Sequence, residues 1–389
     1  MTTTQTEYDQ LAATLEQDGP AAVLDRLANQ LRESKRYHEL FEALKMQVRQ
    51  RIGLPLLYSE SGEELDEATR NQLEEGLLDA CREVGNALLT NGAVREGWMY
   101  LRPVGEQDAV AKLIGSIEAD EDNIDELVEV CLHEGVDPAR GFGLVLEHYG
   151  TCNSITTYES AMHQRSRTEQ QACAGMLVEH LHGELVATVK ADIAQQQGAE
   201  PPETTLKALV DDRDWLFGEH SYHVDTTHLA STVRFARVLE DESQLRLALD
   251  LTAYGRHLSE QFQYQGDEPF AEIYPSHALY FHALLGEEVD TAIQYFREKA
   301  ESLDAYEHGL GPIECYVDLL SRVGRNADAI GEALRLSPED ARPTGQAPTL
   351  LELSEAAGTY DDFLKYCREK DDILGFTTGL LKSQEPNTP

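Results

Sequence analysis

Apolar residues recur every three or four positions along this chain, and that spacing constrains its fold more than any other feature. The pattern is clear at Leu24, Leu27 and Leu31, and it continues as far as Leu381. Residues three or four apart share one face of an α-helix, so the pattern predicts a succession of amphipathic helices. The two-residue alternation typical of strands is nearly absent. We therefore expect an all-α protein.

Capping and turn residues divide the pattern into short helices. We expect helices over residues 37–51, 66–89, 94–101, 125–133 and 138–148. Two irregular stretches, Gln195–Glu203 and Pro338–Pro348, are rich in loop-forming residues. Short helices joined by short linkers favour antiparallel pairs, and a long series of such pairs stacks into a superhelix.

The segment Gly324–Pro338 resembles the second half of a tetratricopeptide repeat. Val94–Leu101 and Val289–Phe296 resemble first helices of such repeats, and the resemblance covers about a quarter of the chain. The spacing from Gly324 to Pro338 is three residues shorter than the family pattern. The resemblance implies stacked helix pairs and, because such arrays usually bind partner proteins, a scaffold without activity of its own. The matching small, aliphatic and helix-stopping positions are Ala329, Ala333, Leu334, Leu336 and Pro338.

The chain divides into three regions on this pattern. Residues 1–135 and 287–389 have the cleaner repeats. Residues 136–286 depart from them and hold most of the 13 histidines. The central region is therefore where we expect a functional site.

The charge balance excludes one class of partner. There are 71 Asp and Glu residues against 32 Lys and Arg, so the net charge is −39. Such a surface repels phosphate backbones, so we expect no nucleic-acid partner. The acid excess, the preference for Arg (23) over Lys (9) and the low aromatic content of 7% favour a cytoplasmic protein of a salt-accumulating halophile. An acidic protein of a mesophile is the alternative.

The remaining compositional features point to a soluble protein. The N-terminal segment Met1–Leu11 is polar, and no apolar run reaches the roughly 18 residues that span a bilayer. We expect a cytoplasmic location and no membrane partner. The six cysteines form no CxxC pair, which argues against a zinc ribbon or a disulfide framework.

One histidine cluster suggests metal chemistry. Before a predicted helix the chain should be extended, so His223 and Asp225 project to one side, and His228 in the first helical turn can point back toward them. Two imidazoles and a carboxylate suit Zn(II), Fe(II) or Mn(II). His148, His182 and His277 are candidate further ligands from neighbouring helices. The alternative is that Asp225 is only a helix N-cap.

Two functions follow from these patterns. The first is a helical-repeat protein with a His/Asp metal site. Such a protein would be a metal-dependent enzyme that carries out hydrolysis, a lyase reaction or oxygen chemistry on an unknown substrate. The second is a non-catalytic scaffold that binds a protein partner, with structural histidines. The partner is thus either a small molecule or a protein.

Overall fold

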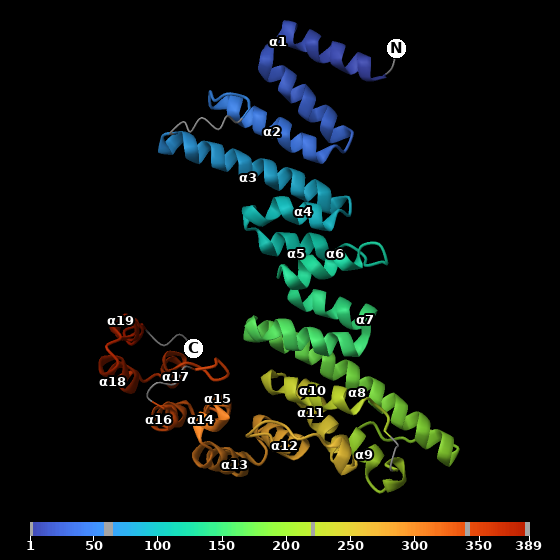
Figure 1. The fold of residues 1–389 in the computed structure, drawn as a ribbon, viewed down its shortest axis with the longest axis vertical. Coiled ribbons are helices and arrows are strands. Elements are labelled where there is room, and N and C mark those ends of the chain that lie inside the picture. The colour runs from blue at the N-terminus through green and yellow to red at the C-terminus, as the bar shows by residue number, and fades with distance from the viewer. Residues whose placement is uncertain (1–2, 58–64, 219–221, 339–342, 386–389) are drawn as a thin grey trace. The chain divides into compact units, whose positions relative to one another are not determined.

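The computed structural model describes residues 3–57, 65–218, 222–338 and 343–385 and is built of helices (Figure 1). Within these ranges the β-structure consists of one isolated bridge between Gln265 and Glu272. The all-α prediction is therefore confirmed. The chain forms two compact units, Met1–Gly150 and Thr151–Pro389. The three-region division by repeat pattern stays a prediction, because compactness does not test repeat boundaries.

In the first unit, successive helices from α1 to α5 contact one another, and α6 packs against α4. The predicted helices 37–51 and 94–101 have these same bounds in the structure, and the helix predicted over 66–89 is shifted by one residue. The helices are α1 (Thr3–Glu33), α2 (Tyr37–Arg51), α3 (Glu67–Thr90), α4 (Val94–Leu101), α5 (Gln107–Gly115) and α6 (Ile124–Val128), with a short 3₁₀ helix at Arg102–Val104 and a π-helical turn at Glu129–His133.

An N-cap residue determines where α3 begins, and a glycine determines how closely α3 packs against α4. The Asp66 carboxylate accepts a hydrogen bond from the Thr69 backbone N–H at 2.9 Å, which satisfies a donor that the first helical turn leaves open. Farther along, Gly85 faces α4, where a Cβ atom would lie 2.5 Å from Leu101 Cγ. Glycine at this position lets the two helix backbones approach.

Helix α7 (Pro138–Ala161) is interrupted at Gly150, whose φ is 78° and ψ is 178°. Glycine adopts this conformation without the steric cost that a Cβ would bring. The helix predicted over 138–148 therefore has a second segment after the interruption. The boundary between the two units falls at the same residue.

The second unit begins with the second segment of α7. Its longest helix starts with a capping box, in which the Ser166 hydroxyl and the Glu169 carboxylate bond reciprocally to the backbone, and ends at left-handed Gly198. The helices are α8 (Arg167–Gln197), α9 (Leu206–Val210), α10 (Thr226–Phe235), α11 (Glu242–Gly255), α12 (Ile273–Leu284), α13 (Val289–Ser302), α14 (Ala305–His308), α15 (Gly311–Arg322), α16 (Asn326–Leu336), α17 (Leu350–Ala357), α18 (Asp361–Glu369) and α19 (Ile373–Lys382), with 3₁₀ turns at Met162–Gln164, Asp214–Leu216, Ala236–Val238 and Glu260–Phe262.

Neighbouring helices again contact one another from α15 to α19, whereas α8 contacts α9, α10 and α11 together. A partly buried ionic network joins three parts of this unit. Asp318 on α15 accepts from the Tyr280 hydroxyl of α12 at 2.7 Å and from the Arg167 guanidinium of α8 at 3.1 Å. Arg322 donates to the backbone carbonyl of Arg237 at 2.5 Å and to that of Leu239. These charges are paired and hydrogen-bonded, as burial requires.

Candidate functional site

The predicted metal ligand Asp225 is the N-cap of α10. Its carboxylate accepts from the backbone N–H of Thr227 at 2.8 Å and of His228 at 3.4 Å, and from the Thr227 hydroxyl at 2.6 Å. These bonds, above all that from the Thr227 hydroxyl, lower the pKa of Asp225 below its usual value. The carboxylate is therefore ionised at neutral pH and already stabilises the helix start.

His223 lies just before this cap, with its side chain only 7% exposed. Its Nδ1 is 2.9 Å from the Tyr254 hydroxyl of α11, and its Nε2 is 3.1 Å from the Asp192 carboxylate of α8. The His223 backbone N–H also donates to the Tyr254 hydroxyl, at 3.1 Å. Both ring nitrogens thus have partners, which tie the segment before α10 to two other helices.

His223, Asp225 and His228 nevertheless line one cavity of about 430 Å³. Helix α8 contributes four of the lining residues, including Glu184. Glu184 lies 3.3 Å from His180 Nε2 on the same helix. In the part of the chain that the structure describes, no group of three or more His, Cys, Asp or Glu side chains is placed to hold a metal ion. The other lining residues are Thr151, Leu181, Ala187, Thr188 and Val224.

The further predicted ligands, His148, His182 and His277, are not among the residues that line this cavity. His182 Nε2 is 2.8 Å from Asp250 of α11. His148 is exposed and belongs to the first unit. His277 is buried on α12, where its Nδ1–H donates to the Ile273 carbonyl at 2.6 Å and its ring stacks on Phe270 at 4.2 Å between centroids. His182 and His277 therefore line no part of the cavity at His223.

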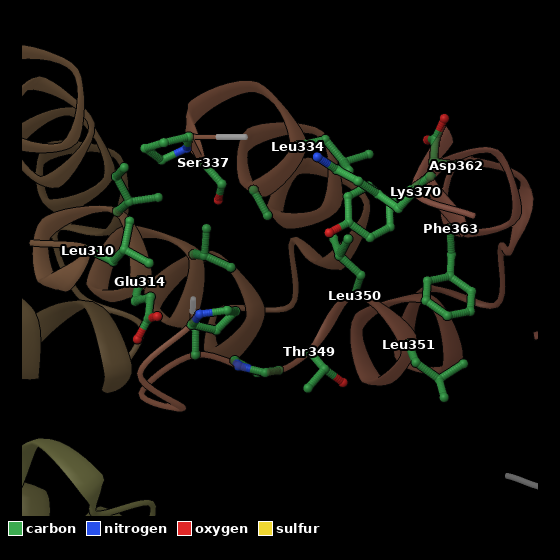
Figure 2. Close-up of a pocket in the computed structure, with 18 of the residues that line it drawn as sticks. Leu310, Glu314, Leu334, Ser337, Thr349, Leu350, Leu351, Asp362, Phe363 and Lys370 are labelled. Carbon is green, nitrogen blue, oxygen red and sulfur yellow. The ribbon is translucent and has the colours of Figure 1, made fainter. Parts of the chain in front are cut away.

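A second cavity, of about 810 Å³, is an apolar groove formed by α15, α16, α17 and α18 and by the loop before α17. Leu310 and Glu314 lie at one end of it, and Phe363 and Lys370 lie at the other (Figure 2). Leu334 and Leu350 lie between these ends. The apolar lining residues are Leu310, Ile313, Val317, Ala333, Leu334, Pro338, Pro343, Ala347, Pro348, Leu350, Leu351, Phe363 and Tyr366.

A buried carboxylate fixes one wall of this groove. Glu314 on α15 is only 7% exposed and accepts from the backbone N–H of Thr344 at 2.6 Å and of Gln346 at 3.1 Å, as well as from the Thr344 hydroxyl. Three donors compensate the cost of burying its charge. The loop 343–349 is thereby held against α15. Residues 343–348 of this loop belong to the irregular stretch predicted at Pro338–Pro348; residues 339–342 lie outside the described residues.

Charges of both signs lie along the groove at α18. Asp362, Lys365, Glu369 and Lys370 are exposed there, and Lys365 Nζ is 3.9 Å from the Glu369 carboxylate. Ion pairs this exposed contribute little to stability. The groove thus combines an apolar floor with a mixed polar edge, which is a common composition for recognition surfaces.

Comparisons with protein families, curated proteins and solved structures gave no match. Among the described helices, none is both long and apolar enough to cross a membrane.

Proposed function

We propose that this chain is a non-catalytic, tetratricopeptide-like scaffold of stacked helix pairs that binds a protein partner in the groove of α15 to α18. The observation that carries the proposal is the groove itself. Four helices and one loop contribute apolar side chains to a single concave surface in a chain with net charge −39. Exposing such a surface to water costs free energy that a bound apolar segment would recover.

The partner segment is expected to present one or two large apolar side chains to Leu334, Leu350 and Phe363. A groove of about 810 Å³ accommodates several side chains. The alternating charges on α18 would orient the segment by pairing with its flanking residues, adding specificity more than affinity. Because Glu314 holds the loop 343–349, this wall of the groove is preformed, which lowers the ordering cost of binding.

The test is a selection from a random peptide display library on the immobilised full chain. Peptides rich in leucine or aromatic residues should be enriched on the wild-type protein and lost on a Leu334→Glu/Leu350→Glu variant. Both leucines are only partly buried, so the variant should keep its helical content by circular dichroism. Met99→Glu, at a 58% exposed site on α4, is the matched control and should bind as wild type does. Enriched peptides that bind the groove variant equally well would overturn the proposal.

Metal binding at the cavity of His223, Asp225 and His228 is the second proposal, with metal-dependent catalysis as its consequence. The observation in its favour is that all three line one cavity together with Glu184. A divalent ion such as Zn(II), Fe(II) or Mn(II) would have to displace the bonds that His223 makes to Tyr254 and Asp192. Measured metal content decides between the two proposals.

A further inference from the structure

Helix α19 presents an apolar face to solvent. Ile373 and Leu374 are 81% and 77% exposed, and Leu380 and Leu381 are 46% and 64% exposed. On a helix these four side chains fall within a sector about 120° wide, with Thr377 between them. The opposite side packs closely on α18, where a Cβ at Gly379 would lie 2.7 Å from the Phe363 ring. A surface helix normally buries its apolar face, so this arrangement is the reverse of the usual one.

The sequence of this helix is nearly symmetric about Thr377. Ile373, Leu374 and Gly375 before the centre are mirrored by Gly379, Leu380 and Leu381 after it. The flanking residues carry opposite charges, Asp372 at the start and Lys382 at the end. A two-fold interface brings residue i against residue j and residue j against residue i, so it requires this kind of self-complementarity.

We propose that α19 is a homodimerisation helix that pairs antiparallel with α19 of a second copy, with Thr377 on the two-fold axis. This register places Ile373 against Leu381 of the second copy and Leu374 against its Leu380. It also places Asp372 against Lys382 at both ends of the pair. An unrelated apolar partner would need none of this mirror symmetry, which is why a second copy is the occupant that the face fits.

The charges at the helix ends favour the antiparallel orientation of the two helices, and the apolar side chains supply the affinity. Antiparallel packing brings opposite ends of the helix dipoles together, whereas parallel packing would place Asp372 beside Asp372. Asp372 already caps Gly375 N–H at 2.8 Å, and Lys382 Nζ contacts Glu355 at 3.0 Å, so each end pair adds little energy. Each copy carries a net charge of −39, so repulsion between copies opposes dimerisation until salt screens it.

Sedimentation velocity of the full chain over a dilution series, in dilute and in molar KCl, tests the proposal. We expect a monomer–dimer equilibrium that is tighter in molar KCl. Leu374→Glu should raise the dissociation constant roughly a hundredfold, because it buries an unpaired carboxylate in the interface. Met99→Glu makes the same change at another exposed site and should leave dimerisation unaltered. A wild-type monomer at every concentration and salt, or dimers that persist in Leu374→Glu, would overturn the proposal.

A cross-link supplies a readout that does not depend on weakening the interface. Thr377→Cys in a Cys152→Ser background, which removes the exposed native cysteine, should form a disulfide between copies under mild oxidation, because the two thiols meet at the axis. Met99→Cys in the same background should not. Equal cross-linking at both positions would show that the contact is random collision and would exclude the proposed register.

Discussion

The Asp250 carboxylate accepts a hydrogen bond from His182 Nε2–H at 2.8 Å and so connects α11 to α8. The same carboxylate accepts from the backbone N–H groups of Leu206 and Lys207 at 2.6 and 2.8 Å. These are the first donors of α9, which has five residues and little stability of its own. One aspartate thus positions α9 on two longer helices.

Replacing Asp250 with alanine should destabilise the second unit. The Asp250 side chain is 10% exposed and that of His182 is 12% exposed. The change therefore leaves three donors without an acceptor, and two of them, on His182 and Leu206, are poorly hydrated. We expect the free energy of unfolding to fall by about 2–3 kcal/mol. Urea unfolding followed by circular dichroism measures it. Glu184→Ala removes a 57% exposed carboxylate of α8 and should change the midpoint little; equal midpoints for the two variants would contradict the structural role of Asp250.

His277 should make stability depend on pH. Burial lowers the pKa of His277 well below 6.5, and the charges of Arg237 and Arg234 lower it further. The imidazole stays neutral in the folded protein, while the unfolded chain takes up a proton below about pH 6.5. Because the unfolded state then binds more protons, the free energy of unfolding falls as pH decreases, by up to about 1.4 kcal/mol per pH unit for this group.

The His277→Gln variant isolates this contribution. Glutamine keeps a hydrogen-bond donor for the Ile273 carbonyl and does not titrate, while all carboxylates remain common to both proteins. Chemical unfolding across acid to neutral pH should therefore give a shallower acid-side decline for the variant. Parallel curves for the two proteins would show that His277 is not held neutral.

Salt should stabilise the folded chain. A net charge of −39 produces self-repulsion in the compact state, and the Debye length shrinks from about 10 Å at 0.1 M to about 3 Å at 1 M salt. We expect the melting temperature to rise steadily from dilute buffer to molar KCl. Differential scanning calorimetry measures this change. A flat dependence would contradict the halophile interpretation and favour an acidic protein adapted to ordinary salt.

The sequence predicted helices well where local signals mark their ends. The helices at 37–51 and 94–101 are each followed within a few residues by glycine and proline, which favour turns. Both helices have the predicted bounds. The helix predicted over 125–133 also matches a helical segment to within one residue, but its second half, Glu129–His133, is a π-helical turn rather than α-helix. A π-turn adds one residue to the helical repeat, and apolar spacing does not reveal it.

The site could be predicted only in part, because its partners are distant in sequence. Asp225 as an N-cap follows from its position, which the sequence offered as the alternative to metal binding. The bonds of His223 to Asp192 and Tyr254 each join residues 31 positions apart. The groove was missed because Leu334 and Leu350 have the same spacing as core leucines. Whether such a residue is buried or faces a groove depends on tertiary packing.

The last prediction concerns metal. If the cavity at His223, Asp225 and His228 binds a divalent ion, the full chain purified without a histidine tag in high salt should contain Zn, Fe or Mn in stoichiometric amount by plasma mass spectrometry. His223→Ala and Asp225→Ala should each lose it, and acid pH should release it, because imidazole ligands must be neutral. His38→Ala is the matched control, because His38 is an exposed histidine of the first unit that contacts Glu96 and Tyr100.

Metal-free wild-type protein that binds none of the three ions on titration would eliminate the metal proposal and leave the scaffold. In that case the Asp225 variant should still lose about 1 kcal/mol of stability through its missing N-cap, which separates a structural aspartate from a ligand.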